Sequence, residues 1–319
     1  MARLALAVDL GGTNLRVAVV DRDGDIQSET QQPTGAADGP KAVVERIGDA
    51  VNELARNAQV PADIPIGVAS PGPLDPRTGI VYFSPNLPGW SDVPISAWLR
   101  EKTGREVLLS NDANAAALGE VFFGAGRGTR NLIYVGLGTG VGGGVYSEGL
   151  LIDGVRGMGG ELGHVTVDLN GPRCTCGSAG CIEAYCSAWA LTRDARELVA
   201  SGRGAAILKA AGTDSEVGPK AIGTAAHDGD AAALALLDRA GRALGAGLAS
   251  FVNIFNPEVI ALGGGVAQVG DPLIEPAKRA LDAFSMPVMR KDARFVPSEL
   301  GVKTGIYGAA ALSFYDAPH

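Results

Sequence analysis

The sequence is poor in aromatic residues, in cysteine and in positive charge. Of its 319 residues, 5% are aromatic and 4 are cysteine, and 35 acidic residues outnumber 27 Lys and Arg to give a formal net charge of −8. A nucleic-acid surface needs clustered Lys and Arg, and no such run is present. We therefore expect no nucleic-acid partner, and a small polar or neutral ligand instead.

Long apolar runs are also lacking. No segment reaches the roughly 20 apolar residues of a membrane span, so we expect no membrane association. The opening run MARLALAV stops at Asp9, too early for the apolar region of a signal peptide. We therefore expect a cytoplasmic protein whose thiols stay reduced, so that a local cysteine cluster indicates a metal before a disulfide.

What the chain does contain is enough apolar sequence for a large core. With 46% apolar residues over 319 positions, two domains are the default expectation. Strands, glycine-rich turns and helices alternate, which predicts an α/β fold. The pattern predicts strands over 4–10, 15–21 and about 26–31, a helix over 41–57, and a buried strand over 64–70.

Two glycine-rich segments share one pattern. VDLGGTNLRVAVV from Val8 and VGLGTGVGGGVYS from Val135 both predict a strand, a glycine-rich hairpin and a second strand. They differ where Asp9 of the first corresponds to Gly136 of the second. This pattern indicates a duplicated unit whose two copies grip one ligand from opposite sides, although glycine-rich turns can also resemble each other by chance.

Glycine hairpins suit a polyphosphate. Their backbone can approach closely, and successive N–H groups bind phosphate oxygens without a lysine. Thr13 and Thr139 can add hydroxyl donors, and Asp9 is placed to hold Mg²⁺, which prefers one or two carboxylates with substrate oxygens. A third candidate is EVIALGGGVA (258–267), a buried strand that runs into glycines before an expected helix.

The segment LLSNDANAAALGE (108–120) predicts a strand followed by a helix. Asp112 would then stand at the junction, where α/β proteins bind ligands. One interpretation is that Asp112 accepts a proton from a substrate hydroxyl during phosphoryl transfer. The other is that it caps the helix and has no chemical role.

Seven short motifs follow one another along the chain. They are DLGGTN (9–14), SPGPLD (70–75), PNLPGW (85–90), NDANAAALGE (111–120), GLGTGVGGG (136–144), GELGH (160–164) and CTCGSAGCIE (174–183). Together they resemble the ROK family of bacterial sugar kinases and repressors, and its glucokinase branch most of all. The resemblance runs from about residue 4 to residue 312 and is far more specific than any one motif.

The resemblance implies an actin and hexokinase-like ATPase fold, with two ribonuclease H-like domains and an interdomain cleft. We expect a small N-terminal α/β domain over 1–115, against which a C-terminal helix at about 303–319 packs. A large α/β domain over 116–302 would carry a zinc-binding segment at 161–183. Family resemblance also implies a homodimer or homotetramer.

The resemblance also implies roles for single residues. Asp112 is the expected general base. The expected sugar ligands are Asn86, Asn111, Asp112, Glu161, His164 and Glu183. The expected nucleotide and phosphate ligands are Asp9, Gly11, Gly12, Thr13, Asn14, Gly138, Thr139, Gly140, Gly263, Gly264 and Gly265.

Three of the four cysteines and one histidine form a candidate zinc site. Cys174, Cys176, Cys181 and His164 give a Cys₃His set that would close a tetrahedral shell with no position for water. Such a site is structural and would not activate a nucleophile. We expect it to fix the segment that carries the sugar ligands, with one ring nitrogen of His164 on zinc. Cys186 lies outside the spacing and is expected to be an ordinary buried residue.

The function implied by these features is ATP-dependent phosphorylation of a hexose, glucose first, with Mg²⁺ bound to ATP. N-acetylglucosamine, N-acetylmannosamine, mannose or fructose are alternative substrates, and polyphosphate is an alternative donor. In a different class, the chain could be a sugar sensor without catalysis. The ROK repressors add an N-terminal helix-turn-helix domain, and only eight residues precede Asp9. The roles of Arg16 and of Trp90, which could stack on a sugar or pack in a loop, stay open.

Overall fold

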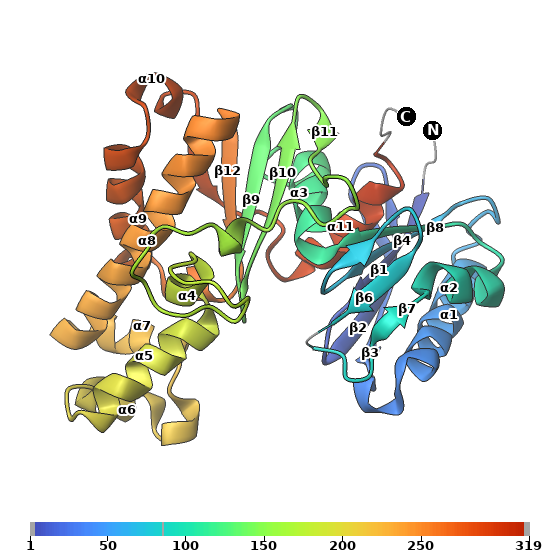
Figure 1. The fold of residues 1–319 in the computed structure, drawn as a ribbon. Helices are drawn as coiled ribbons and strands as arrows, with labels where there is room; N and C mark the ends of the chain where they lie inside the picture. The colour runs from blue at the N-terminus through green and yellow to red at the C-terminus, as the bar shows by residue number, and fades with distance from the viewer. Residues whose placement is uncertain (1–3, 85, 316–319) are drawn as a thin grey trace. The chain divides into compact units, whose positions relative to one another are not determined.

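The computed structural model describes residues 4–84 and 86–315, which divide into two compact units (Figure 1). Unit 1 is made of the described parts of Met1–Tyr134, Gly144–Gly160 and Ser298–His319, and unit 2 of Val135–Gly143 and Glu161–Pro297. The domain boundary expected after residue 115 stays a prediction. Residues 316–319, the end of the expected C-terminal helix, lie outside the described residues. None of the described helices has the length and apolar composition needed to cross a membrane.

The main sheet of unit 1 has the strand order β3-β2-β1-β4-β8. Its strands are β1 (Leu4–Leu10), β2 (Asn14–Asp21), β3 (Ile26–Pro33), β4 (Ile66–Ser70) and β8 (Val107–Asn111). β1 pairs antiparallel with β2 and parallel with β4, and β4 pairs parallel with β8. The strands expected from the sequence are therefore confirmed, with bounds that differ by at most two residues.

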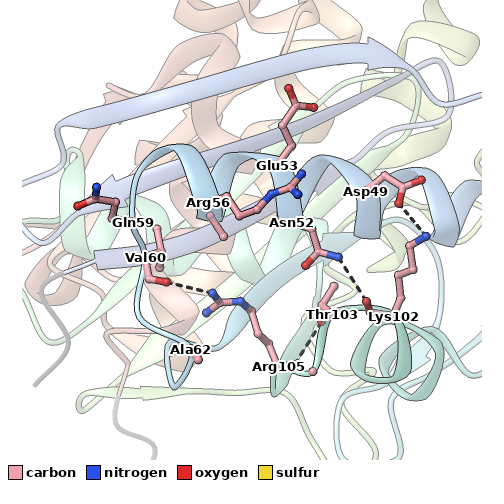
Figure 2. Close-up of a pocket in the computed structure, with 12 residues that line it drawn as sticks. Asp49, Asn52, Glu53, Arg56, Gln59, Val60, Ala62, Lys102, Thr103 and Arg105 are labelled. Carbon is pink, nitrogen blue, oxygen red and sulfur yellow. Dashed lines mark hydrogen bonds and ion pairs between the residues drawn. The ribbon is translucent and has the colours of Figure 1, made fainter.

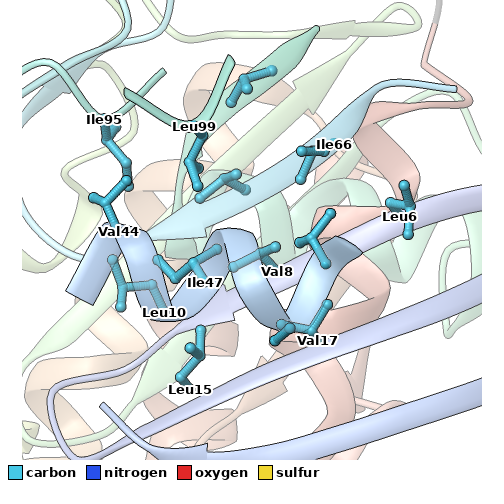
Figure 3. Close-up of a cluster of buried hydrophobic side chains, with 14 of the residues drawn as sticks. Leu6, Val8, Leu10, Leu15, Val17, Val44, Ile47, Ile66, Ile95 and Leu99 are labelled. Atoms are coloured by element: carbon cyan, nitrogen blue, oxygen red, sulfur yellow. The ribbon is translucent and has the colours of Figure 1, made fainter. Parts of the chain in front are cut away.

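One face of this sheet carries the large apolar side chains (Figure 3). They pack against α1 (Pro40–Asn57) and α2 (Ile95–Thr103). The helical face predicted within 41–57 is confirmed, because all of its members are buried: Val43, Val44, Ile47, Val51 and Leu54. Each fully buried side chain of this size contributes about 1.5–3 kcal/mol to folding.

The other face carries small side chains and is covered by α3 (Asp112–Phe123) and α11 (Thr304–Leu312). The LALAVDL pattern explains the difference, because successive strand residues point to opposite faces. Leu6 and Val8 therefore join the core beside α1, whereas Ala5 and Ala7 pack with α3 and α11. Small residues allow the helices on this face to approach the sheet closely.

The remaining elements of unit 1 are short. A small sheet has the order β5-β6-β7, with β5 (Leu74–Asp75), β6 (Ile80–Phe83) and β7 (Ser91–Val93). Two 3₁₀ helices, η1 (Ala36–Asp38) and η5 (Gly301–Lys303), precede α1 and α11.

A second large sheet has the order β11-β10-β9-β12-β13. Its strands are β9 (Leu132–Leu137), β10 (Val141–Ser147), β11 (Leu150–Leu151), β12 (Val259–Gly263) and β13 (Arg294–Pro297). Counted along the chain within each sheet, the order third, second, first, fourth, fifth is the same in both sheets. The repeat suggested by the two glycine-rich segments is thus a repeat of topology, and each segment joins the first two strands of its sheet.

Helices make up most of the rest of unit 2 (Figure 1). They are α4 (Glu183–Cys186), α5 (Ala188–Ala200), α6 (Ala205–Ala211), α7 (Pro219–His227), α8 (Ala231–Phe255), α9 (Asp271–Phe284) and α10 (Pro287–Arg290), with 3₁₀ helices η2 (Leu162–His164), η3 (Asp214–Glu216) and η4 (Val266–Val269). The helix expected from Ala231 is α8, and its expected apolar face is core, because Leu237, Leu244, Leu248 and Phe251 are buried.

Candidate active site

The first glycine hairpin joins β1 to β2 and is held by its own backbone. The Gly11 amide donates to the Asn14 carbonyl over 3.0 Å, and a Cβ on Gly11 would lie 2.8 Å from that carbonyl oxygen. Thr34, which is fully buried, donates from Oγ1 to the Gly11 carbonyl over 2.7 Å and from its amide to the Thr13 carbonyl over 2.9 Å. The hairpin backbone is thereby fixed, while the Thr13 and Asn14 side chains are exposed.

Asn86 lies directly against this hairpin. A Cβ on Gly12 would lie 2.9 Å from both the Cβ and the carbonyl oxygen of Asn86, so only glycine permits this approach. The structure thus brings together an expected phosphate ligand and an expected sugar ligand. Trp90, by contrast, is 4% exposed and belongs to the unit 1 core, which favours its packing role over sugar stacking.

Three neighbouring parallel strands end at one edge of the main sheet. Asp9 of β1 pairs with Ala69 of β4, and Ser70 pairs with Asn111, the last residue of β8. The carboxyl ends of parallel strands are where open α/β sheets bind their ligands. Asp9, Asn111 and the adjoining Asp112 therefore stand at the edge that this rule favours.

Asp9 has a partly buried carboxylate, whose side chain is 25% exposed. Burial raises its pKa, and the Arg16 guanidinium, 3.9 Å away, opposes that shift. Arg16 also donates to Gln31 Oε1 over 3.0 Å and to the Val302 carbonyl over 2.6 Å. Arg16 therefore joins β2, β3 and the turn before α11, a role that the sequence left open.

Asn111 caps α3. Its Oδ1 accepts from the amides of Ala113 over 2.9 Å and Asn114 over 3.3 Å, and its Nδ2 donates to the Gly72 carbonyl over 3.4 Å. The interpretation that Asp112 is the N-cap is therefore wrong. Asp112 is instead the first residue of the helix, is exposed, and accepts from the Ala113 amide through Oδ1 over 2.8 Å.

The second glycine hairpin joins β9 to β10 and contacts a third glycine segment. The Gly138 amide donates to the Gly140 carbonyl over 2.9 Å. Gly264 has φ +88° and would place a Cβ 2.2 Å from the Leu137 carbonyl oxygen, so it lies against the end of β9. The helix expected after Gly263, Gly264 and Gly265 is α9, and the 3₁₀ helix η4 lies between the glycines and α9. Gly270, at φ +79°, separates the two helices.

The predicted zinc ligands lie together in unit 2. The ligand atoms of His164, Cys174, Cys176 and Cys181 are all within 4.8 Å of one another. Cys176 Sγ and Cys181 Sγ are 3.7 Å apart, and Cys174 Sγ is 3.6 Å from His164 Nδ1. A tetrahedral zinc with bonds of about 2.3 Å places its sulfur ligands about 3.8 Å apart, so the residues fit that metal.

The protonation of these thiols follows their surroundings. Burial raises the pKa of Cys181 to about 12 and also raises that of Cys174, whereas the Ser178 amide lowers the pKa of Cys176. A metal must therefore displace protons from the two buried thiols. Cys186 is fully buried and donates to the Ala240 carbonyl over 3.1 Å, which confirms the expectation for it.

Glu161 and His164 stand beside this cluster. His164 directs Nδ1 to the cysteines, and its Nε2 lies 3.9 Å from Glu161 Oε2. Because Nδ1 is the nitrogen in the cluster, Nε2 is left to meet Glu161 or a ligand. Glu161 itself is exposed.

Glu183 connects the cysteine cluster to the second hairpin. Its Oε2 accepts from the Val141 amide over 3.0 Å, and its Oε1 accepts from Thr175 Oγ1 over 3.0 Å and from Cys174 Sγ over 3.6 Å. A Cβ on Gly140 would lie 2.5 Å from Glu183 Oε2. The expected sugar ligand Glu183 is therefore 7% exposed and holds protein groups with both oxygens.

A separate cavity of about 960 Å³ lies beside α1 and α2 (Figure 2). Three of its charged side chains are already engaged: Lys102 pairs with Asp49, and Arg105 donates to the carbonyls of Val60, Pro61 and Ile64. It contains none of the expected site residues. The expected site residues form one group in unit 1 and another in unit 2.

Comparisons with known proteins agree with the sequence motifs. The family model described as the ROK family matches residues 5–314. The chain is 40% identical to a glucokinase of Thermotoga maritima over 96% of each chain. Among solved structures, it is similar to a ROK hexokinase of Thermus thermophilus (TM-score 0.83, 37% identity, 98% of each chain). It is also similar to a ROK glucokinase of Streptomyces griseus in complex with glucose and AMPPNP (TM-score 0.78, 34% identity, 97% of this chain and 98% of that one).

Proposed function

The chain belongs to the ROK family, and on that premise we propose that it is a glucokinase, which transfers the terminal phosphoryl group of ATP to the 6-hydroxyl of glucose. The observation that carries the proposal is the state of Asp112. It is an exposed carboxylate at the carboxyl edge of a parallel sheet, and Asn111 performs the capping of α3 in its place.

In this proposal Asp112 is the general base. Its carboxylate takes the proton of the sugar hydroxyl while that oxygen forms a bond to the γ-phosphorus. The bond between the γ-phosphorus and the bridging oxygen breaks, and its electron pair leaves with ADP. Because phosphoryl transfer depends on positioning and charge stabilisation, the other residues have binding roles.

The nucleotide is assigned to the glycine segments. Backbone amides of Gly12, Thr139 and Gly140 would meet phosphate oxygens, while Gly11 and Gly138, whose amides donate within their own hairpins, let the backbone approach closely. The side chains of Thr13, Asn14 and Thr139 are exposed beside them. Gly263–Gly265 complete the set in unit 2. Mg²⁺ bound with ATP neutralises phosphate charge, and Asp9 would hold it, directly or through water.

The sugar is assigned to Asn86, Asn111 and Asp112 in unit 1, and to Glu161, His164 and Glu183 in unit 2. Glu183 already accepts hydrogen bonds from Val141 and Thr175, so it would bind a sugar hydroxyl through its remaining acceptor capacity. Carboxylates accept from sugar hydroxyls, and amide groups both donate and accept. A structural Zn²⁺ on His164 and the three clustered cysteines would hold the second group in place.

Assembly and location rest on the family resemblance. We propose a homodimer or homotetramer, and the exposed side chains of Ile254, Phe284, Met286 and Val288 in unit 2 provide apolar surface for such contacts. We also propose a cytoplasmic location, since the cysteines are free thiols that a reducing compartment would preserve.

The proposal is tested by ADP release with ATP across glucose, mannose, fructose, N-acetylglucosamine and N-acetylmannosamine. We expect the highest kcat/KM with glucose, and a reaction without sugar serves as the control. A higher value for another hexose would identify a different kinase of the same family. Sugar binding without turnover of any hexose would indicate a regulator instead, and replacing ATP with polyphosphate tests the donor.

A further inference from the structure

Asp9 lies on the face of β1 that α11 covers. Strand alternation places Asp9 on the same face as Ala5 and Ala7, and these two alanines pack with Ile306 and Ala309 of α11. Its register partner on β2 is Arg16, which lies on the same face. The carboxylate of the proposed magnesium ligand is therefore directed toward the C-terminal helix.

The backbone of α11 approaches its neighbours closely. A Cβ on Gly67 of β4 would lie 1.9 Å from the Ala309 carbonyl oxygen, and a Cβ on Gly308 would lie 2.5 Å from the carbonyl carbon of Ala115 in α3. There is thus no space for even a methyl group at these glycines, and α11 packs closely against the backbones of β4 and α3. The position of α11 beside Asp9 is therefore fixed by this packing.

Gly305, the second residue of α11, faces the Asp9 carboxylate. A Cβ at this position would lie 2.4 Å from Asp9 Cγ and 2.5 Å from each carboxylate oxygen. We propose that Gly305 is a positioning residue for the phosphoryl transfer, because its missing side chain leaves the space in which the Asp9 carboxylate stands.

The start of α11 is held by several contacts. A side chain at position 305 would therefore displace the Asp9 carboxylate and not the helix. Arg16 donates to the Val302 carbonyl over 2.6 Å, Lys303 pairs with Glu29 over 2.9 Å, and Thr304 Oγ1 donates to the Gly301 carbonyl over 2.6 Å. These contacts fix the turn before Gly305 to β2 and β3. A side chain at 305 would therefore rotate the Asp9 carboxylate away and leave the helix where it is.

The present position of the carboxylate is electrostatically favourable. It lies near the Arg16 guanidinium, at 3.9 Å, and near Gly305 in the first turn of α11, where the helix dipole favours negative charge. Displacement of the carboxylate would weaken both interactions as well as move the metal ligand.

This inference rests on the proposed role of Asp9 in holding Mg²⁺, and three variants separate the two claims. They are Gly305→Ala, Asp9→Ala and the double variant, with Gly223→Ala as a matched control. Gly223 is also a glycine within a helix, and its Cβ would meet nothing closer than 3.5 Å. AMPPNP binding is measured by calorimetry with and without Mg²⁺, and the Tm is recorded for each variant.

We expect Gly305→Ala to weaken AMPPNP binding about 10- to 100-fold in Mg²⁺, as loss of a group that orients a metal ligand does, and to leave binding without Mg²⁺ unchanged. Asp9→Ala should weaken it at least as much, and adding Gly305→Ala to Asp9→Ala should cause no further loss. If Gly305→Ala lowers the Tm, then Asp9→Ala should restore it, because the atoms that the new Cβ meets are gone.

The possible failures are distinguishable. If Asp9→Ala binds AMPPNP with Mg²⁺ normally, the proposed role of Asp9 is wrong and the role of Gly305 falls with it. If Asp9→Ala is impaired but Gly305→Ala matches Gly223→Ala, the inference about Gly305 alone is overturned. Additive losses in the double variant, or a Tm loss that Asp9→Ala does not restore, would also overturn it.

Discussion

The two glycine hairpins share a backbone pattern and differ in how each acquires a carboxylate. In the first, Asp9 belongs to the strand that enters the hairpin, and Thr34 holds the hairpin carbonyls. In the second, the corresponding residue is Gly136, and Glu183 approaches from another segment to hold the Val141 amide. The carboxylate of the first hairpin therefore belongs to its own strand, whereas the carboxylate at the second hairpin comes from the segment that carries the cysteine cluster.

This difference predicts which substitutions in each unit should affect chemistry and which should affect stability. In unit 1, Asp9, Asn111 and Asp112 stand at strand ends and depend on the sheet. In unit 2, Glu183 depends on the loop around Cys174 and Thr175, to which it is hydrogen-bonded. Changes at Asp112 should affect chemistry with little loss of structure, because Asn111 caps α3, whereas changes at Glu183 should affect both.

The largest expected effect is from Asp112→Asn, which tests the first half of the comparison. Loss of the proton acceptor should lower kcat by about two to four powers of ten, while KM for glucose and the Tm stay nearly unchanged. Steady-state kinetics and thermal unfolding measure this, with the exposed Asp214→Asn as the control. Turnover within a few-fold of the unchanged enzyme would remove Asp112 from the role of general base.

Cys176→Ser tests the second half of the comparison, the cysteine cluster of unit 2. Loss of one of four ligands should weaken zinc binding by about 100-fold or more, lower the Tm and raise KM for glucose. Metal analysis after dialysis and thermal unfolding check the result. Cys186→Ser is the matched control, because Cys186 lies outside the cluster, and it should keep one zinc per chain. Protein purified without zinc but with the same Tm would contradict the structural role.

Glu183 connects the cysteine cluster to the second glycine hairpin. Two substitutions separate the effect of its charge from the effect of its hydrogen bonds. Glu183→Ala leaves the buried Val141 amide unpaired and should cost about 1–3 kcal/mol of unfolding free energy. Glu183→Gln keeps an acceptor for that amide and should retain most of the stability. Denaturant unfolding measures both. Equal losses in the two variants would mean that the charge, and not the hydrogen bond, holds the hairpin.

Thr34→Val gives the smallest expected effect. It tests the side-chain hydrogen bond that holds the first hairpin, as Glu183 holds the second. It keeps the side-chain shape but removes the hydrogen bond to the Gly11 carbonyl, at a cost of about 1 kcal/mol. A small rise in KM for ATP should accompany it. Thr34→Ser retains the hydroxyl and should stay close to the unchanged protein in both measurements, and a similar loss there would point to packing instead.

Much of this architecture could be predicted from local patterns. The apolar run LALAVDL predicted the strand β1, whereas the division of its large and small side chains between two faces became visible only in the structure. The cysteine spacing with His164 predicted the cluster, because four ligands within a short segment have few other arrangements. NDANAAALGE predicted the strand-to-helix junction but not its cap, since Asn111 and Asp112 are both good capping residues and only their backbone positions separate them.

Other features depend on residues that are distant in the chain. The hydrogen bond from Val141 to Glu183 crosses 42 positions, and no spacing rule identifies it. Thr34 gave no signal, because a single threonine after a strand is common. Gly305 lacks a side chain altogether, and its importance is visible only once α11 is placed against Asp9.

The contact between β1 and α11 also has a consequence for how the protein is made. Ala5 and Ala7 are covered by residues such as Ile306 and Ala309, which are translated some 300 positions later. At roughly 5–20 residues per second, a ribosome needs about 15–60 s to supply that cover. Until then α3 can cover only part of this side of the first sheet, and nascent chains would depend on chaperones or on transient pairing to keep the rest from aggregating.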